Sequence, residues 1–259
     1  FIMKYNNIFT STSDISSIRE ATKISSQILK TLRDSVKGGL TAEDLNAFAE
    51  LECKKYNVLP AFKGVEGTKM PFDKAVCISI NDEILHGRPS DVNVIKEGDI
   101  VKIDFGIIHN GFYTDHCVTV GVGILSKEEE RLINTAKLCI DEAVKEAVVG
   151  NYTGDISYVL ENIATLGGFN FVTTYCGHGI GKSLHESPEI LSWGDRKTGV
   201  RLQEGMLLCI ENQITMGSAK LKLQPDGWTL KTVDKSKGAM FEHMVLVGKN
   251  SPEILTILD

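Results

Sequence analysis

The order of predicted elements in this 259-residue chain repeats, and this repeat constrains the fold more than any other feature of the sequence. A shift of 112 positions places Arg19 on Arg131 and Thr41 on Thr153. In each half, a long helical pattern precedes a short one, and strand patterns follow. The repeat predicts one domain built from two similar halves. Chance similarity between two capped helix pairs is the alternative interpretation.

Apolar residues recur at helical spacing in the first half. The run from Ile15 to Val36 predicts an amphipathic helix that begins at an Asp14 cap and ends before Gly38-Gly39. A second helix is predicted over residues 41–56. Three side chains of this second helix are predicted to face the core, and they are Leu45, Phe48 and Leu51.

The second half contains the corresponding helices. Ser126, with Glu129 three residues later, predicts a capping box for a helix that ends at Gly150. A shorter helix is predicted from Thr153 to Gly167. Strands are predicted over residues 75–80, 100–108, 169–174, 206–214, 228–232 and 241–247. Because helices and strands come in blocks and do not strictly alternate, the predicted fold class is α+β.

Composition excludes several classes of protein. The formal net charge of -6 and the lack of clustered Lys and Arg argue against nucleic-acid binding. No apolar run reaches the length of a membrane span, and Phe1-Ile2-Met3-Lys4 does not resemble a signal peptide. The six cysteines form no Cys-x-x-Cys pair, which is typical of free thiols in a reducing compartment. The sequence therefore predicts a cytoplasmic protein.

Two aspartates flank a predicted hairpin. Asn110-Gly111 lies between apolar stretches and indicates a tight turn. A two-residue loop, whether 109–110 or 110–111, would place Asp104 and Asp115 on one face, either opposite or diagonal. A three-residue loop would separate them. Two aspartates on a wet face are the simpler interpretation, but apolar neighbours favour carboxylates that share a metal or a charge partner.

Similar acids occur further along the chain. Glu211 ends the apolar run that begins at Met206, and Glu242 precedes Val245-Leu246-Val247. His178 lies in Gly177-His178-Gly179, where a ligand can approach the backbone closely. Each residue alone is typical of a strand end or a surface. Together with the hairpin aspartates they make an oxygen-rich set suited to two divalent ions, with Mn, Fe(II) or Co favoured and Zn possible.

These motifs, taken in order, resemble the methionine aminopeptidase family. The resemblance covers most of the chain and is carried by Asn81-Asp82-Glu83-Ile84-Leu85-His86-Gly87, Asp104 with Asp115, Gly177-His178-Gly179-Ile180-Gly181, His185-Glu186, Glu211 and Phe241-Glu242-His243. Only 26 positions separate His185 from Glu211, so the extra subdomain that marks type II enzymes has no room, and type I is implied.

The resemblance implies a fold and an activity. The fold is the pita-bread fold, in which two pseudo-symmetric helix-helix-strand halves surround a curved antiparallel sheet. A single catalytic domain over residues 1–259 is expected, with a short N-terminal extension of about residues 1–12. The expected activity is removal of the initiator methionine from nascent proteins whose second residue is small.

The resemblance also implies roles for residues. The implied ligands of two divalent ions are Asp104, Asp115, His178, Glu211 and Glu242, with Asp115 and Glu242 bridging. Glu211 would be the general base, and His86 and His185 would contact the substrate near the scissile amide. The implied methionine pocket consists of Phe72, Cys77, Leu184 and Trp228. Taken alone, Cys77 is typical of a buried core thiol. The sequence departs from the family pattern at Phe72, at Leu184 and in the long segment Lys63–Met70.

Two alternatives remain open beside this interpretation. One is an Xaa-Pro peptidase of the same fold, although such proteins usually have an additional N-terminal domain. The other is a non-catalytic pita-bread protein that binds partners, although such proteins generally lose metal ligands. The expected partner is the N-terminal methionine of a nascent polypeptide, the expected state is a monomer, and transient ribosome association is left open.

Overall fold

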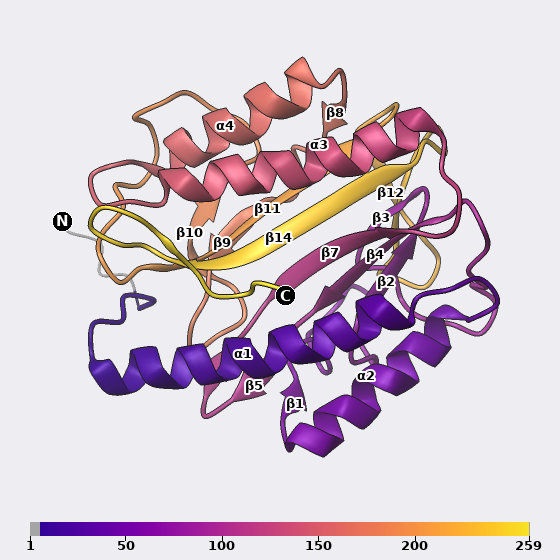
Figure 1. Cartoon of the computed structure of the whole chain (residues 1–259), viewed down its shortest axis with the longest axis horizontal. Coiled ribbons are helices and arrows are strands. Elements are labelled where there is room, and N and C mark those ends of the chain that lie inside the picture. Colours follow the sequence, from indigo (N-terminus) through magenta and orange to yellow (C-terminus); the bar gives the residue numbers. More distant parts are fainter. Residues whose placement is uncertain (1–5, 259) are drawn as a thin grey trace.

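A curved antiparallel sheet runs through the centre of the molecule, and helices α1 to α4 cover its outer side (Figure 1). The structure is a computed structural model that describes residues 6–258. Its elements, in chain order, are α1 (Thr12–Ser35), α2 (Ala42–Tyr56), β1 (Leu59–Pro60), β2 (Cys77–Ile80), β3 (Glu83–Leu85), β4 (Ile100–Phe105), β5 (Ile107–His109), β6 (Phe112–Tyr113), β7 (His116–Gly121), α3 (Lys127–Ala143), η1 (Val144–Glu146), α4 (Thr153–Leu166), β8 (Asn170–Phe171), β9 (Gly177–Gly179), β10 (Glu186–Ile190), β11 (Leu207–Thr215), β12 (Leu221–Leu223), β13 (Leu230–Thr232), β14 (Gly238–Leu246) and β15 (Glu253–Ile254).

The two halves predicted from the repeat are present. The main sheet has nine strands in the order β10-β9-β11-β14-β7-β4-β2, with β8 and β15 paired off this path. Strands β2, β4 and β7 come from the first half, and β11 and β14 come from the second. The halves meet where β14 pairs with β7. In Figure 1, α1 and α2 lie beneath the first set and α3 and α4 above the second.

Each helix pair buries its own apolar core against the sheet. In the first half, Ile28 and Leu45 pack with Ile78 and Ile103 in one cluster of buried residues. In the second half, Leu132, Leu160, Ile210 and Val245 belong to another. Burial of these side chains stabilises the fold by about 1.5–3 kcal/mol each. The α+β class and the pita-bread arrangement are therefore confirmed.

Two details of the predicted helices are wrong. Ser11 caps α1 in place of Asp14, because its hydroxyl accepts a hydrogen bond from the Asp14 N–H at 3.1 Å. On α2, Leu45 is buried, but Phe48 is 38% and Leu51 is 63% exposed. The buried stripe of α2 instead continues to Ala49 and Cys53, and Phe48 and Leu51 lie outside it.

Several predicted boundaries move. The strand expected over residues 100–108 is divided into β4 and β5 at Gly106, where a Cβ atom would lie 2.0 Å from the Thr114 carbonyl oxygen. The strands expected at 169–174 and 228–232 are confined to β8 and β13. The helix expected to reach Gly150 ends as α3 at Ala143 and continues as the 3₁₀ turn η1.

Part of the predicted N-terminal extension is packed onto the second half. The Asn7 side chain is fully buried and donates a hydrogen bond to the Leu207 carbonyl at 2.8 Å. Ile8 pairs with Met206 in an isolated bridge. Residues 1–5 of the extension lie outside the described residues. Within residues 6–258, no helix combines the length and the apolar character needed to cross a membrane.

The capping box of α3 yields a prediction for stability. A hydrogen bond from Lys237 and one from the Ser126 N–H lower the pKa of Glu129 to about 2, from an ordinary value of 4.5. A lowered pKa stabilises the folded state above pH 4.5, and the stabilisation is lost as the pH falls toward 2. Glu129→Gln is therefore expected to lower the free energy of unfolding by about 1 kcal/mol at pH 7.

Urea unfolding of wild type and Glu129→Gln at pH 7 and pH 3 measures this difference, which is expected to shrink at the lower pH. Glu130→Gln is the control, since Glu130 is exposed on the same helical turn. Equal destabilisation by Glu129→Gln at both pH values would contradict the assignment.

Candidate active site

The register of the main sheet places the predicted acidic residues in one row. Glu211 pairs with Glu242 between β11 and β14, and Glu242 pairs with Cys117 between β14 and β7. Cys117 pairs with Asp104, which in turn pairs with Cys77 on β2. Because paired residues point to the same face of a sheet, these five side chains share the inner, concave face.

The Asn110-Gly111 hairpin adds Asp115 to this face. His109 pairs with Phe112, so the loop has two residues, both at positive φ. Continuing the register places Asp115 two residues before Cys117, diagonal to Asp104 across the β4–β7 pair. Of the two arrangements left open by the sequence, the diagonal one is therefore present, and the loop is 110–111.

One cavity on the concave face contains every predicted site residue. The side chains that line it are Phe62, Val65, Phe72, Cys77, Leu85, His86, Asp104, Asp115, His178, Leu184, His185, Glu211, Trp228, Met240 and Glu242. The structure thus brings together the predicted metal ligands, the two substrate-contacting histidines and the four predicted pocket residues.

Three of the four carboxylates of this cavity lack partners that buried charges need, and the fourth, Glu211, accepts a hydrogen bond from the Gln213 side chain. One oxygen each of Asp104, Asp115 and Glu242 is buried without a hydrogen-bond partner in the part of the chain that the structure describes. Desolvation raises the pKa of Asp104 to about 7 and that of Glu211 to about 8. Burial, with the neighbouring carboxylates adding, raises the pKa of Asp115 and Glu242 well above ordinary values. Such a cluster is costly for the protein alone.

His178 is oriented toward the same carboxylates. Its Nδ1 lies 2.9 Å from the Gly179 carbonyl oxygen, so Nδ1–H donates there and Nε2 keeps a free lone pair. Nε2 lies 3.7 Å from the Asp115 carboxylate. Burial and the proximity of the His185 ring lower the pKa of His178 to about 4, which keeps the ring neutral. The Nε2 lone pair and the carboxylate oxygen are both acceptors, and no proton lies between them. A bound cation would satisfy both groups.

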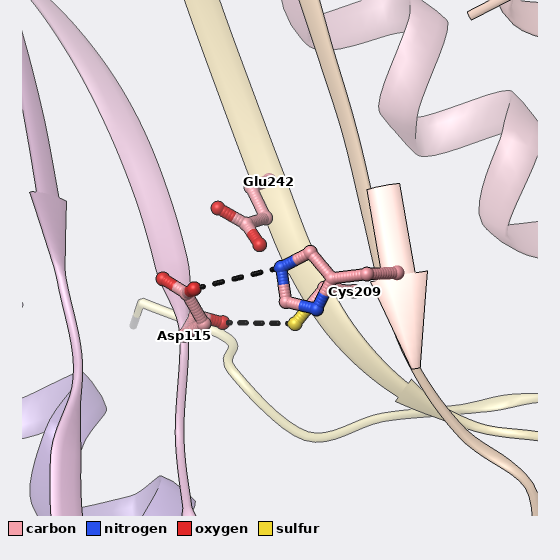
Figure 2. Close-up of side chains that lie close together, drawn as sticks. Asp115, Cys209 and Glu242 are labelled. Atoms are coloured by element: carbon pink, nitrogen blue, oxygen red, sulfur yellow. Dashed lines mark hydrogen bonds and ion pairs between the residues drawn. The ribbon is translucent and has the colours of Figure 1, made fainter. Parts of the chain in front are cut away.

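The donor set therefore fits divalent cations. Asp115, His178, Cys209 and Glu242 each offer a ligand atom, and these atoms lie within 4.8 Å of one another. Figure 2 shows Asp115 and Glu242 pointing toward each other, with Cys209 beside them. Carboxylate oxygens and imidazole suit Mn, Fe(II), Co or Zn. The unpartnered oxygens of Asp104, Asp115 and Glu242 are available to such ions.

Cys209 is a member of this cluster that sequence reasoning missed. It precedes Glu211 by two positions on β11 and pairs with His178 on β9, so strand alternation places it on the concave face. Its thiol lies 3.9 Å from the Asp115 carbonyl oxygen. Burial raises the pKa of Cys209 well above its ordinary value of 9. Sulfur is a poor ligand for hard cations, and we assign Cys209 to packing beside the cluster.

The two predicted substrate-contacting histidines line the cavity together with the carboxylates. His86 has a positive φ of 52° and forms edge-on ring contacts with Tyr175 at 5.5 Å and Trp228 at 6.3 Å. The ring of His185 lies 4.5 Å from that of His178. Desolvation lowers the pKa of both, that of His86 to about 4, so both rings are neutral at pH 7. Tyr175 was not predicted, since a lone tyrosine outside a strand carries no signal.

Apolar side chains form the rest of the cavity. Phe72, Cys77 and Leu184 are nearly fully buried, at 2%, 5% and 8% exposure. Trp228 closes this group with a ring contact to Phe72 at 5.0 Å, and its Nε1–H donates to the Met70 carbonyl at 3.0 Å. An apolar recess next to a carboxylate cluster suits the side chain of a peptide's first residue.

Known proteins share this sequence and fold. The pattern of metallopeptidase family M24 matches residues 16–249. A methionine aminopeptidase from Clostridium acetobutylicum is 39% identical over 252 residues, which cover 97% of this chain and 99% of that protein. The crystal structure of a methionine aminopeptidase from Thermotoga maritima superposes with a TM-score of 0.92 at 37% identity, over 96% of this chain and 99% of that one.

More distant structures share the fold alone. An X-Pro aminopeptidase from Thermotoga maritima superposes with a TM-score of 0.76 at 21% identity, over 98% of this chain and 62% of that one.

The curved sheet with its outer helices and inner carboxylate cluster defines a pita-bread metallohydrolase. The chain belongs to metallopeptidase family M24. It is therefore a hydrolase, and the resemblance to the methionine aminopeptidases is confirmed.

Proposed function

We propose that this enzyme removes the N-terminal methionine from nascent polypeptides, using two divalent ions held by Asp104, Asp115, His178, Glu211 and Glu242. The observation that carries the proposal is the row of carboxylates across paired strands, completed by the neutral His178. Relatives named methionine aminopeptidase match nearly the whole chain. We further propose that residues 1–259 act as one catalytic domain.

The ions would polarise the scissile carbonyl and make a water molecule acidic enough to attack near neutral pH. Glu211 would accept the proton of that water at its carboxylate, as the family resemblance implies, and a hydrogen bond donated by the Gln213 side chain would hold this carboxylate in place. Bound cations would favour its ionised form and offset the raised pKa. The proton accepted by Glu211 would pass to the leaving amine, with His86 a candidate shuttle for it, and His185 would steady the carbonyl oxygen or the leaving amine.

The apolar recess would select the first side chain. Phe72, Cys77, Leu184 and Trp228 would enclose an unbranched thioether, which suits a snug, polarisable pocket. The rings of Tyr175 and Trp228 contact the His86 ring edge-on, at 5.5 Å and 6.3 Å, and would lie beside the second residue of a bound peptide. We therefore propose that only a small second residue is accepted.

The location and partners follow from the proposed substrate. The enzyme would act in the cytoplasm, where nascent chains emerge and where the six free cysteines stay reduced. We propose a monomer, with any ribosome association transient and made through the domain surface.

Hydrolysis of three peptides by metal-stripped protein, before and after addition of Mn(II) or Co(II), tests the proposal. Metal-dependent cleavage of Met-Ala-Ser, with Met-Leu-Ser and Ala-Pro-Ala intact, is expected. Cleavage of Ala-Pro-Ala instead would favour the Xaa-Pro peptidase alternative. A metal-loaded protein that cleaves none of them would indicate a non-catalytic binding protein.

Substitution of Cys77 tests the pocket. Cys77→Ala enlarges the recess, so the ratio of kcat/KM for Met-Ala-Ser over Leu-Ala-Ser is expected to fall by about 10-fold. Metal content, measured by elemental analysis, is expected to stay unchanged. Cys139→Ala is the control, because Cys139 is buried in α3 away from the cavity. Altered metal content with unchanged selectivity would contradict the pocket assignment.

A further inference from the structure

Lys102 is a buried cationic side chain that the proposed mechanism does not use. It is 1% exposed and is one of the largest fully buried side chains of the molecule. Its neighbours along β4, Val101 and Ile103, point to the opposite face, and Ser79 and Thr119 lie beside it on the adjacent strands. Burying an amine is costly unless its N–H donors are hydrogen-bonded. The groups that accept these hydrogen bonds therefore indicate the role of Lys102.

Two backbone carbonyls accept those hydrogen bonds. Lys102 Nζ donates to the Asn81 oxygen at 2.8 Å and to the Gly238 oxygen at 3.1 Å. Asn81 lies in the turn between β2 and β3, and Gly238 is the first residue of β14. The Gly238 N–H also donates to the Asn81 oxygen, at 3.2 Å. An amino group has at least two N–H donors in either protonation state, so this contact needs no particular charge.

Each of the three joined segments leads directly into the active site. Lys102 precedes Asp104 by two positions on the same face of β4. The Asn81 turn continues through β3 to His86, and β14 continues from Gly238 to Glu242. The segments come from both halves of the chain, so their alignment also sets the two halves against each other.

We infer that Lys102 is a positioning residue of the active site, which holds the segments leading to His86 and Glu242 in register with β4. The inference rests on the proposed function, because it concerns the placement of the proposed ligands. Lys102 does not line the cavity, and it acts through the backbone carbonyls it binds.

Lys102→Met keeps the length of the side chain and removes the donors. Its Kd for Mn(II), measured by calorimetric titration, is expected to rise by about 10-fold. The kcat for Met-Ala-Ser is expected to fall by about 10-fold to 100-fold, with a smaller change in KM. A merely structural role would lower the melting temperature while leaving both constants of the folded protein unchanged.

Two controls isolate the position of the amine. Lys231→Met makes the same chemical change beside the same turn, where Lys231 forms half-exposed ion pairs with Asp82 and Glu83. Leu132→Ala lowers stability through the distant core of α3. Both controls are expected to keep the wild-type Kd for Mn(II) and the wild-type kcat.

The outcomes separate the inference from the proposed function. Wild-type constants in Lys102→Met would overturn the inference alone. If that variant does not fold, Lys102→Gln keeps an N–H donor on a shorter stem and is expected to show the same losses at smaller size. A wild-type Kd for Mn(II) and a wild-type kcat in Lys102→Gln would likewise overturn the inference. A wild-type protein that neither binds Mn(II) nor cleaves Met-Ala-Ser would overturn the proposed function and the inference together.

Discussion

Replacement of Glu211 by glutamine is expected to lower the kcat for Met-Ala-Ser by about 1,000-fold, because it removes the proposed general base. The amide has the shape of the carboxylate and can still accept the hydrogen bond from Gln213. The change also removes a negative charge from a cluster in which desolvation and Asp104 raise the pKa of Glu211 to about 8. The fold is therefore expected to survive, and the melting temperature of the metal-free protein should not fall.

Single-turnover kinetics at saturating Mn(II) separates the loss of the base from the loss of a ligand. Saturation restores occupancy if Glu211→Gln only weakens binding, whereas a missing base leaves the chemical step slow. Glu161→Gln is the matched control, since Glu161 accepts a hydrogen bond from the Gly194 N–H outside the cavity. Near-normal kcat in Glu211→Gln would rule out the proposed proton acceptor.

Local patterns were enough to predict the hairpin and its aspartates. A two-residue Asn-Gly turn fixes the pairing of the residues on either side, and the period of two along a strand then assigns each residue to a face. Asp104 and Asp115 could therefore be placed on one face from about a dozen residues of sequence. The same logic, applied to β11, would have placed Cys209 beside Glu211. A thiol within an apolar run reads as core, which is why it was missed.

The distribution of α2 side chains shows where local patterns fail. Phe48 and Leu51 are apolar, yet they lie off the stripe that meets α1 and the sheet. Only the packing of α2 against its neighbours decides which apolar positions are buried, since surfaces of folded proteins also contain apolar residues. By hydrophobicity alone, Phe48 is expected to be more buried than Ala49. The packing of α2 against its neighbours instead buries Ala49 and leaves Phe48 exposed.

Pairing between distant strands could not be read from spacing. Glu211 and Glu242 are adjacent because β11 pairs with β14, and the halves join because β14 pairs with β7. The sequence indicated that each acid lies near the end of a strand. Only the family resemblance indicated which acids lie next to one another. Nothing in the sequence indicated that Lys102 is buried, because a lysine in an alternating strand is usually exposed. The two carbonyls that accept its hydrogen bonds come from the β2–β3 turn and from the first residue of β14, 21 and 136 positions away.

Replacement of Asp115 by asparagine is expected to change stability in opposite directions with and without metal. Burial and the neighbouring carboxylates raise the pKa of Asp115 well above 3.8, so its ionised form opposes folding as the pH rises above that value. At pH 7.5 in chelator, the neutral amide is expected to raise the free energy of unfolding by about 1–2 kcal/mol. With Mn(II) at about 100 times its Kd, wild type should gain about 2.7 kcal/mol, and the variant should gain almost none.

Asp155→Asn is the control that gives this result its meaning. Asp155 is equally buried, but it accepts a hydrogen bond from the Tyr152 N–H at 2.9 Å and lies 3.6 Å from Arg196. Its carboxylate is therefore partnered within the protein, and Asp155→Asn should cost about 1 kcal/mol whether or not metal is present.

Urea titrations of both variants, with chelator and with Mn(II), give four comparisons with wild type. If Asp115→Asn behaves like Asp155→Asn, then Asp115 contributes to stability by itself and the carboxylate cluster is not a metal site. Stabilisation without metal combined with a lost response to metal is expected only where a residue is kept for binding at the expense of stability.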